Sequence, residues 1–308
     1  MSEEMEGLFD TDGVETEELR RLLIAEIVDY ANNRPRNLQK EIGPSGIGTP
    51  CSRKLAYAVN YEDPHGPNKY TEVLPSLIGT SMHETMEKVL AYSNAKIVMR
   101  QQRERHKAGV FDSSVTEYEN LSDAIESISA GKHVGPLRWL AENKVKLPIA
   151  GTCDVYDTWT YTIVDWKFLG NDTHGKYAKK GPPPTHYIVQ VHTYGAGIVE
   201  LGYRVDRVGI MMIPRSGVLR NSVLWAEKFD PDIAKKAVAR VEAVKLISSE
   251  FNVNANPYKY RHIPATPSDS DCFFCPHFNP IPDANPYHCQ GTAGQTDSDG
   301  HLIDKEAP

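Results

Sequence analysis

Asp154, Asp165 and Lys167 are the residues of this sequence whose types and spacing point most directly to chemistry. Asp165 and Lys167 are two positions apart in an apolar run, 161–169, that predicts a strand, so their side chains project from the same face. The preceding run, 147–158, predicts a strand that pairs with it in antiparallel fashion across a tight turn. Asp154 would then lie beside the other two at the open end of the hairpin.

Two carboxylates and one ammonium around a point suit the hydrolysis of a phosphodiester bond. Mg²⁺ and similar hard cations prefer oxygen ligands. A bound cation polarises a phosphoryl oxygen and lowers the pKa of its water, and a neighbouring lysine stabilises developing charge. The alternative is a hairpin with a surface Asp–Lys pair, because Asp-x-Lys alone occurs by chance in many proteins.

Four short motifs extend this pattern along the chain. They are Gly79-Thr-Ser-Met-His83-Glu-Thr-Met-Glu87 in a predicted helix, Gly151-x-x-Asp154, Asp165-x-Lys167, and Gln190-x-x-x-Tyr194 in a later helix. Their order resembles that of the RecB-like branch of the PD-(D/E)XK nucleases, especially the CRISPR-associated single-strand exonucleases and the AddB-type helicase–nuclease subunits. The resemblance covers roughly residues 50 to 290.

The resemblance implies a role for each motif residue. The metal ligands would be His83, Asp154, Asp165 and the backbone carbonyl of Trp166. Lys167 would be the catalytic lysine, with Gln190 and Tyr194 beside it on one face of their helix. Asp165 occupies a place where many family members carry Glu, and the shorter side chain should shift the metal slightly.

By this resemblance we expect a metal-dependent DNA exonuclease, a hydrolase that uses Mg²⁺ or Mn²⁺. It would degrade single-stranded DNA from an end, 5′→3′, in recombination, repair or DNA processing. Two alternatives stay open: a non-catalytic iron–sulfur DNA-binding module of a recombination complex, and a flap or single-strand endonuclease that uses the same site. The sequence has no Gly-x-x-x-x-Gly-Lys-Ser/Thr phosphate loop, so we expect a stand-alone nuclease or one with a helicase or recombinase partner.

Four of the five cysteines predict a second site. Cys51 is far from Cys272, Cys275 and Cys289, which follow the spacing C-x₂-C-x₁₃-C. Four thiolates suit a 4Fe–4S cluster or a tetrahedral zinc ion, although a zinc ribbon usually has two short Cys-x-x-Cys pairs. The spacing also resembles that of the iron–sulfur nucleases of the same family. We therefore expect a cluster that joins the N- and C-terminal segments, and Cys153 as a small core residue.

The charge of the chain is uneven. Its 308 residues carry a net charge of −7, but residues 1–18 hold eight acids and no Lys or Arg, leaving 34 basic and 33 acidic residues elsewhere. This balance neither requires nor excludes a DNA partner. Three basic stretches could contact phosphates: Arg53-Lys54, Arg100 to Lys107, and Lys176, Lys179 and Lys180 in a predicted loop.

The order of predicted elements indicates an α/β fold. We expect helices at 16–31, 76–93, 121–131 and 186–201 and after Asp230, strands at 115–120, 147–158, 161–169, 205–214 and 223–229, and a loop at 170–184. Strands with helices before, between and after them predict a mixed central sheet flanked by helices, and the resemblance implies the PD-(D/E)XK restriction-endonuclease-like core.

The domain organisation follows from composition. We expect one iron–sulfur nuclease domain at 15–290, between a disordered acidic tail, 1–14, and a polar C-terminal tail, 291–308. The sequence contains no run of about 18 apolar residues, so we expect no membrane span. The first residues lack the pattern of a secretory signal, so we expect a cytoplasmic protein.

Overall fold

A computed structural model describes residues 14–33, 42–60, 73–146, 148–266, 272, 275–281 and 284–291. The predicted tails therefore lie almost wholly outside the described residues. The chain divides into two compact units, one formed by Met1–Lys40 with His65–Ile78 and the other by Glu41–Pro64 with Gly79–Pro308. Within the described ranges, no helix combines the length and the apolar character needed to span a membrane.

The first unit contains α1 (Val14–Asn32), as the apolar periodicity predicts, and the first turn of the long helix α4 (Leu74–Lys107). The second unit contains the rest of α4 and all other described elements. Its further helices are α2 (Pro44–Ile47), α3 (Ser52–Val59), α5 (Leu121–Ser129), α6 (Asn171–Lys180), α7 (Thr185–Glu200) and α8 (Pro231–Glu250), with 3₁₀ turns at η3 (Leu219–Asn221) and η4 (Pro257–His262). Asp230 caps α8 by accepting a hydrogen bond from the Asp232 backbone N–H, as predicted.

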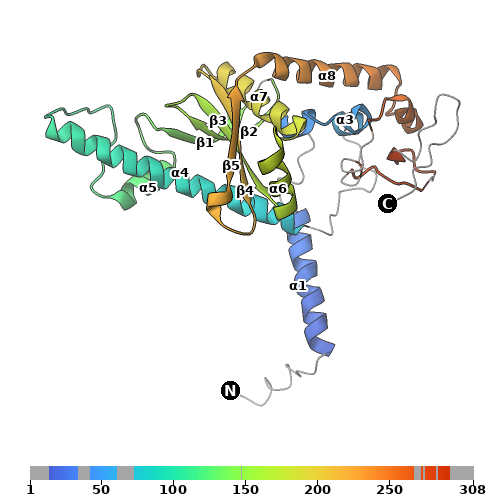
Figure 1. Cartoon of the computed structure of the whole chain (residues 1–308), viewed down its shortest axis with the longest axis horizontal. Coiled ribbons are helices and arrows are strands. Elements are labelled where there is room, and N and C mark those ends of the chain that lie inside the picture. Colours follow the sequence, from blue (N-terminus) through green and yellow to red (C-terminus); the bar gives the residue numbers. More distant parts are fainter. Residues whose placement is uncertain are drawn as a thin grey trace. The chain divides into compact units, whose positions relative to one another are not determined.

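A five-stranded mixed sheet organises the second unit (Figure 1). Its strands are β1 (Trp139–Val145), β2 (Gly151–Asp157), β3 (Thr162–Leu169), β4 (Arg207–Pro214) and β5 (Val223–Lys228), in the spatial order β1-β2-β3-β4-β5. Only the β3–β4 pair is parallel. A parallel pair needs a crossover connection, which α6 and α7 supply. The predicted mixed sheet flanked by helices is confirmed.

Helix α7 covers one face of this sheet. Val191, Tyr194 and Ile198 on the helix form one buried cluster with residues of β2, β3 and β4, among them Cys153, which is fully buried as predicted. Alternation along β3 directs Ile163, Asp165 and Lys167 toward α7 and Phe168 to the other face. Helix α4 meets that other face, where the His83 ring lies edge-on to the ring of Phe168.

A separate apolar core lies between α3 and α8. Leu55 and Tyr57 of α3 pack with Val241 of α8 and Tyr260 of η4, and all four side chains are almost completely buried. This core fixes the start of α3, where Cys51 is the N-cap residue and its sulfur accepts a hydrogen bond from the Lys54 backbone N–H. The cysteine is thereby held at the end of a packed helix.

Three predicted elements differ from the structure. The helix expected at 76–93 continues to Lys107, because 94–107 contains strong helix formers and neither Gly nor Pro. The strand expected at 115–120 is wrong. That segment is held by Gln102, whose side-chain amide accepts from the Tyr118 N–H and donates to the Tyr118 carbonyl, both at 3.0 Å.

The loop expected at 170–184 is also wrong, since α6 occupies its first part. Its prolines, which suggested a loop, begin only after Gly181, where a φ of 111° ends the helix without the strain that a side chain would add. Strand β1 was not predicted. Its sequence, WLAENKV, is too polar to show a strand pattern, because β1 is an edge strand paired only with β2.

Candidate metal and cysteine sites

The first site forms where β2 and β3 diverge. Their ladder pairs Asp157 with Thr162 and continues to Val155 opposite Val164. Beyond that point, the Trp166 backbone N–H donates a 2.8 Å hydrogen bond to Asp154 Oδ2. The Asp154 carboxylate therefore replaces a backbone carbonyl as the partner of β3, and this bond holds it next to Asp165.

Gln190 of α7 joins the two functional residues of β3. Its Nε2 donates to Asp165 Oδ1 at 2.9 Å, and its Oε1 accepts from Lys167 Nζ at 3.0 Å. Lys167 Nζ also lies 2.5 Å from Asp165 Oδ2. One turn along α7, the Tyr194 hydroxyl is 3.4 Å from Gln190 Nε2. The predicted Asp165, Lys167, Gln190 and Tyr194 are thus brought into one buried network.

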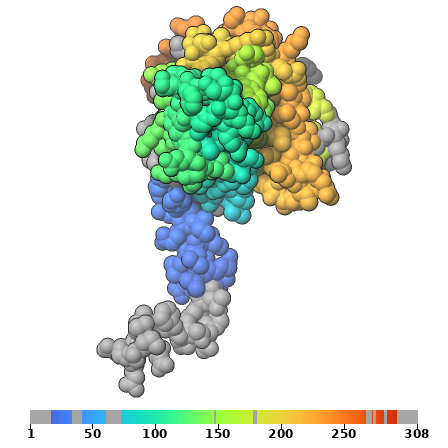
Figure 2. Space-filling model, turned by 90° about the vertical axis from the view of Figure 1, so that its left-hand side faces the viewer, coloured from blue at the N-terminus to red at the C-terminus, as the bar shows by residue number. Residues whose placement is uncertain are grey.

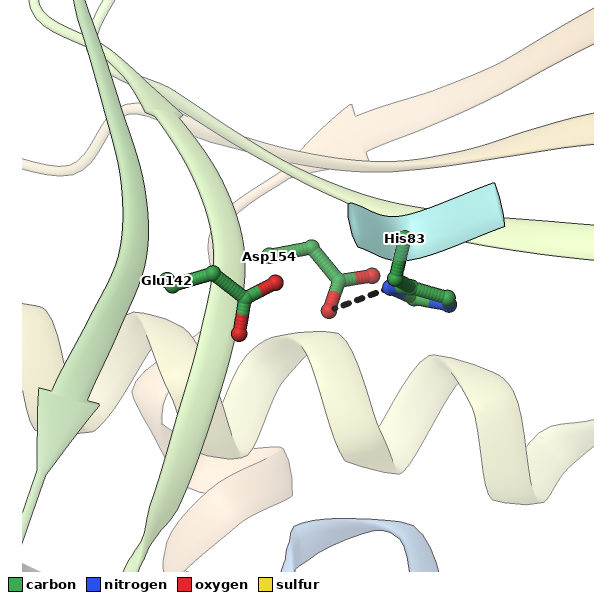
Figure 3. A group of neighbouring side chains, drawn as sticks. All are labelled: His83, Glu142 and Asp154. Atoms are coloured by element: carbon green, nitrogen blue, oxygen red, sulfur yellow. Dashed lines mark ion pairs between the residues drawn. The ribbon is translucent and has the colours of Figure 1, made fainter. Parts of the chain in front are cut away.

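His83, Glu142 and Asp154 form the outer part of the site (Figure 3). They come from α4, β1 and β2, and one ligand atom of each lies within 4.8 Å of the other two. His83 Nδ1 is 3.3 Å from Asp154 Oδ1. A nitrogen and two carboxylates from three separate elements match the donors that divalent cations take in proteins.

Glu142 is the site residue that sequence analysis missed, because β1 itself was not predicted. Its backbone φ is 48°, in the left-handed region that costs free energy for a residue with a side chain. It lies between Ala141 and Asn143, which pair with Val155 and Cys153, so Glu142 is placed opposite Asp154. Strained backbone held by surrounding structure is common at functional sites.

Asp165 and Lys167 form a buried ion pair. Burial raises the pKa of Asp165 to about 6; the Lys167 ammonium opposes this shift and the Asp154 carboxylate adds to it. Burial also disfavours the charged form of Lys167, but the Asp165 carboxylate outweighs this and raises the pKa of the lysine. Both groups are therefore charged at neutral pH, with Lys167 Nζ 4.8 Å from the centre of the Tyr187 ring.

The environment of His83 is governed by Asp154. Burial disfavours the imidazolium, yet the hydrogen bond to Asp154 and its negative charge together raise the pKa of His83 above its ordinary value. The carboxylates around this histidine give the site an excess of negative charge, which favours a bound positive charge. A bound cation would supply that charge in place of the proton.

Cys51, Cys272, Cys275 and Cys289 line one hollow of the second unit together with Tyr57 and Phe278. The structure thus brings together all four cysteines that the spacing selected, although they come from opposite ends of the chain. The Gly291 backbone passes close beside them, since a Cβ at that position would lie 3.2 Å from Cys272 Sγ. A set of four sulfur donors around a largely apolar hollow fits either a cluster or zinc.

Arg53 ties this second site to the chain around it. Its Nη1 donates to Cys289 Sγ at 3.3 Å, and its other nitrogens donate to the carbonyls of Arg261 and Ile263. Burial raises the pKa of the Cys275 thiol, so that thiol is kept protonated unless a metal or a cation compensates its charge. Arg53, predicted as a phosphate contact, instead faces the cysteines.

The other two predicted basic stretches lie on helices. Arg100 to Lys107 forms the last part of α4, and Lys176 is exposed on α6, where the side chains of Lys179 and Lys180 lie outside the described residues. Neither stretch is a loop. Basic side chains on a helix keep a fixed spacing, which determines how a phosphate backbone could run along them.

Comparisons with known proteins give no family assignment. No family model matches the sequence, and no curated protein matches it either. Among solved structures, an alkaline exonuclease (LHK-Exo) from Laribacter hongkongensis aligns with a TM-score of 0.32 and 16% identity, over 54% of this chain and 85% of that one. The same enzyme in complex with dAMP gives 0.31 and 15%, over 56% and 92%. Similarity of this size establishes neither the fold nor the function of this chain.

Proposed function

We propose that this protein is a metal-dependent DNA nuclease that hydrolyses single-stranded DNA from an end. The observation that carries the proposal is the Gln190 bridge, which holds Asp165 and Lys167 together next to Asp154. A hairpin with a mere surface ion pair would not bury these groups or give them a shared partner. The 5′→3′ direction and a role in recombination, repair or DNA processing belong to the same proposal.

The residues of the site have distinct roles in this function. His83, Glu142 and Asp154 would hold a Mg²⁺ or Mn²⁺ ion, with Asp165 and the Trp166 carbonyl as further ligands. The ion supplies positive charge at the scissile phosphate and acidifies its water. Lys167 presents an ammonium beside that phosphate and can stabilise the negative charge that develops on its oxygens.

Gln190 and Tyr194 would position the reacting groups and would not react themselves. The Gln190 amide and the Asp165 carboxylate each accept one hydrogen of the Lys167 ammonium, which leaves one N–H group for the phosphate. Burial raises the pKa of Tyr194, and the Asp165 charge adds to this, so its hydroxyl stays protonated and remains available as a donor. α7 thereby sets the orientation of the groups that β3 carries.

The experiment that tests this function uses single-stranded DNA labelled at either the 5′ or the 3′ end. Purified protein is incubated with Mg²⁺ or Mn²⁺, beside Asp165→Ala and an EDTA control. We expect metal-dependent release of nucleotides from the 5′ end, and loss of that release in the variant. Cleavage of circular single strands would instead assign an endonuclease.

Absence of cleavage would separate the remaining alternatives. If protein with its cysteine site loaded binds DNA but does not cut it, with or without metal, the exonuclease proposal is wrong. A non-catalytic DNA-binding module would then account for the fold. Cleavage that appears only when a helicase or recombinase is added would make the nuclease one part of a larger assembly.

We also propose that the four cysteines hold a 4Fe–4S cluster. Their shared hollow and the two N–H donors to sulfur, from Arg53 and the Lys54 backbone, support this assignment, since hydrogen bonds to the sulfurs are usual around such clusters. The cluster would tie α3 to the segment after η4. Its role would be structural, because it lies against the α3–α8 core and not in the network of Asp165 and Lys167.

A further inference from the structure

A hollow lined by basic and aromatic side chains lies beside the middle of α4. It has a volume of about 670 Å³, and its main lining residues are Tyr92, Lys96, Arg100, Arg103, Arg138 and Trp159. We call it the basic–aromatic groove. Figure 2 is turned toward the end of the second unit where α4 and α5, in teal to green, form the nearest surface. No Asp or Glu is among the described residues that line the groove.

We infer that this groove binds the single-stranded DNA that leads to or from the metal site. The inference rests on the proposed nuclease function for its ligand, but on different residues for its evidence. None of the groove residues belongs to the network around Asp165 or to the cysteine site. The chain as a whole is acidic, so a hollow with four cations and no carboxylate in its lining is a local exception.

The α4 side of the groove presents a row of charges. Lys96, Arg100 and Arg103 are four and three residues apart, so they share one face of the helix and are exposed on it. Arg100 has only a 3.9 Å contact with Glu104, and its side chain is 60% exposed. Cations spaced at helical intervals can contact successive phosphates without reading base sequence.

The opposite side of the groove is built around Arg138. Its guanidinium stands over two indole rings, 4.2 Å from the centre of Trp139 and 4.5 Å from that of Trp159. Two hydrogen bonds of 3.1 Å from Arg138 to the buried Asp157 fix its orientation. An arginine held in this way is organised before any ligand arrives, and so are the rings that it contacts.

Two aromatic side chains in the groove are open to a ligand. Trp159, in the turn between β2 and β3, is 49% exposed, and Tyr92 on α4 is 47% exposed, with Lys96 Nζ 5.3 Å from its ring centre. Unpaired bases stack on such rings, whereas the bases of a duplex are already stacked on one another. Exposed aromatics beside a row of cations therefore favour a single strand over a duplex.

The groove lies at a definite distance from the metal site along α4. Lys96 is about 20 Å and Arg103 about 30 Å from His83 at the helical rise per residue. A strand that reached from the metal site to the groove would need roughly six nucleotides at a stacked rise of 3.4 Å. Short oligonucleotides should therefore occupy the metal site without the groove, and longer ones should occupy both.

The test measures binding of fluorescein-labelled oligothymidylate by anisotropy, with Lys167→Ala as the background so that no cleavage occurs. Strands of about 4 and about 20 nucleotides are compared between about 50 and 200 mM salt. The variant is Arg100→Gln with Arg103→Gln. Its matched control, Lys235→Gln with Lys245→Gln, removes the same charge from exposed positions on α8.

We expect the groove variant to weaken binding of the long strand about tenfold or more and to leave the short strand unchanged. The slope of log K against log salt should fall by about 1.4, the value for two lost phosphate contacts on a single strand. Trp159→Ala should weaken binding of the long strand on the order of tenfold and reduce the quenching of tryptophan fluorescence by that strand. Equal affinities and equal slopes for the groove variant and the α8 control would overturn the inference.

Failure of the groove and failure of the nuclease can be told apart. If the chain with Lys167 intact cleaves DNA and the groove variant cleaves the long strand with an unchanged KM, the groove is wrong and the nuclease stands. If the chain never cleaves but binds the long strand through the groove, the nuclease is wrong and the groove stands. A duplex that competes better than the single strand would overturn the assignment of the ligand.

Discussion

Gln190 on α7 accepts a 3.0 Å hydrogen bond from Lys167 on β3, so a crossover helix holds the lysine of the strand that precedes it. The Gln190→Ala variant should lose this hydrogen bond to Lys167. Because the ammonium would then be held by Asp165 alone, kcat for DNA cleavage should fall about 10- to 100-fold, as for other partners that orient active-site groups.

If Gln190 positions Lys167, its loss should lower kcat and leave substrate binding almost unchanged. The Kd for single-stranded DNA and the KM should change little, because Gln190 is only 5% exposed and lies behind the lysine. The Tm should be measured in parallel. The control is a substitution of an apolar residue elsewhere on α7. If both variants lose kcat equally, in proportion to their loss of Tm, Gln190 is only a packing residue.

Glu142 should matter for metal binding more than for stability. Removing its negative charge in Glu142→Gln should weaken Mn²⁺ binding about tenfold or more, measured by isothermal titration calorimetry. Glu126→Gln on α5, an exposed acid, is the matched control. An unchanged Mn²⁺ affinity in Glu142→Gln would exclude Glu142 from the metal site.

The backbone of Glu142 gives a second readout. Glycine adopts a φ near 48° without strain, so Glu142→Gly should bind metal poorly yet unfold at a Tm no lower than that of the unsubstituted chain. A residue kept only for packing would show the reverse, with reduced Tm and intact metal binding.

Cys275→Ala should remove the cluster. The anaerobically purified variant should lack the brown colour and visible absorbance of the parent protein and should lose a large part of its stability. The cluster would close the loop between Cys51 and Cys272, and closing so long a loop stabilises the folded state by on the order of 4–5 kcal/mol in the chain-entropy model. Iron and sulfide analysis beside thermal unfolding checks both effects.

The fifth cysteine provides the control for that experiment. Cys153 lies in the core under α7 and does not line the hollow of the other four cysteines, so Cys153→Ala should lower Tm while the colour remains. If the parent protein is colourless and contains one zinc ion, the four sulfurs bind zinc and not a cluster. Full colour in Cys275→Ala would contradict the assignment of the ligands.

Asp157 should make stability depend on pH. Burial alone would raise its pKa, but hydrogen bonds from Arg138, Thr160 and the Trp159 backbone N–H outweigh burial and lower the pKa below its ordinary value of 3.8. A carboxylate with a lowered pKa stabilises the folded state at neutral pH, and this contribution is lost as the pH falls through the pKa of the folded protein.

The free energy of unfolding should therefore decrease between about pH 5 and about pH 3, in part through Asp157. Asp157→Asn should reduce the unfolding free energy at neutral pH by about 1–3 kcal/mol and flatten this dependence. Urea unfolding at several pH values measures both, with Glu242→Gln on α8 as an exposed control. An undiminished pH dependence in Asp157→Asn would contradict the prediction.

Local spacing in the sequence predicted much of this protein. The pair Asp165 and Lys167, two apart on an apolar strand, and Gln190 and Tyr194, four apart on a helix, were placed on the correct elements because their side-chain directions follow from strand and helix periods. The mixed sheet and the cap at Asp230 followed from the same kind of local signal.

Only the tertiary structure decided which distant residues meet. Glu142 joins His83 and Asp154 because a polar edge strand pairs with β2, and nothing in its own sequence indicates a strand. Trp159 and Arg138 reach the basic face of α4 for the same reason, since hairpin and helix come together through packing. Local patterns determine which face a side chain takes, whereas long-range contacts depend on the burial of whole elements, and the spacing of residues along the chain does not record that burial.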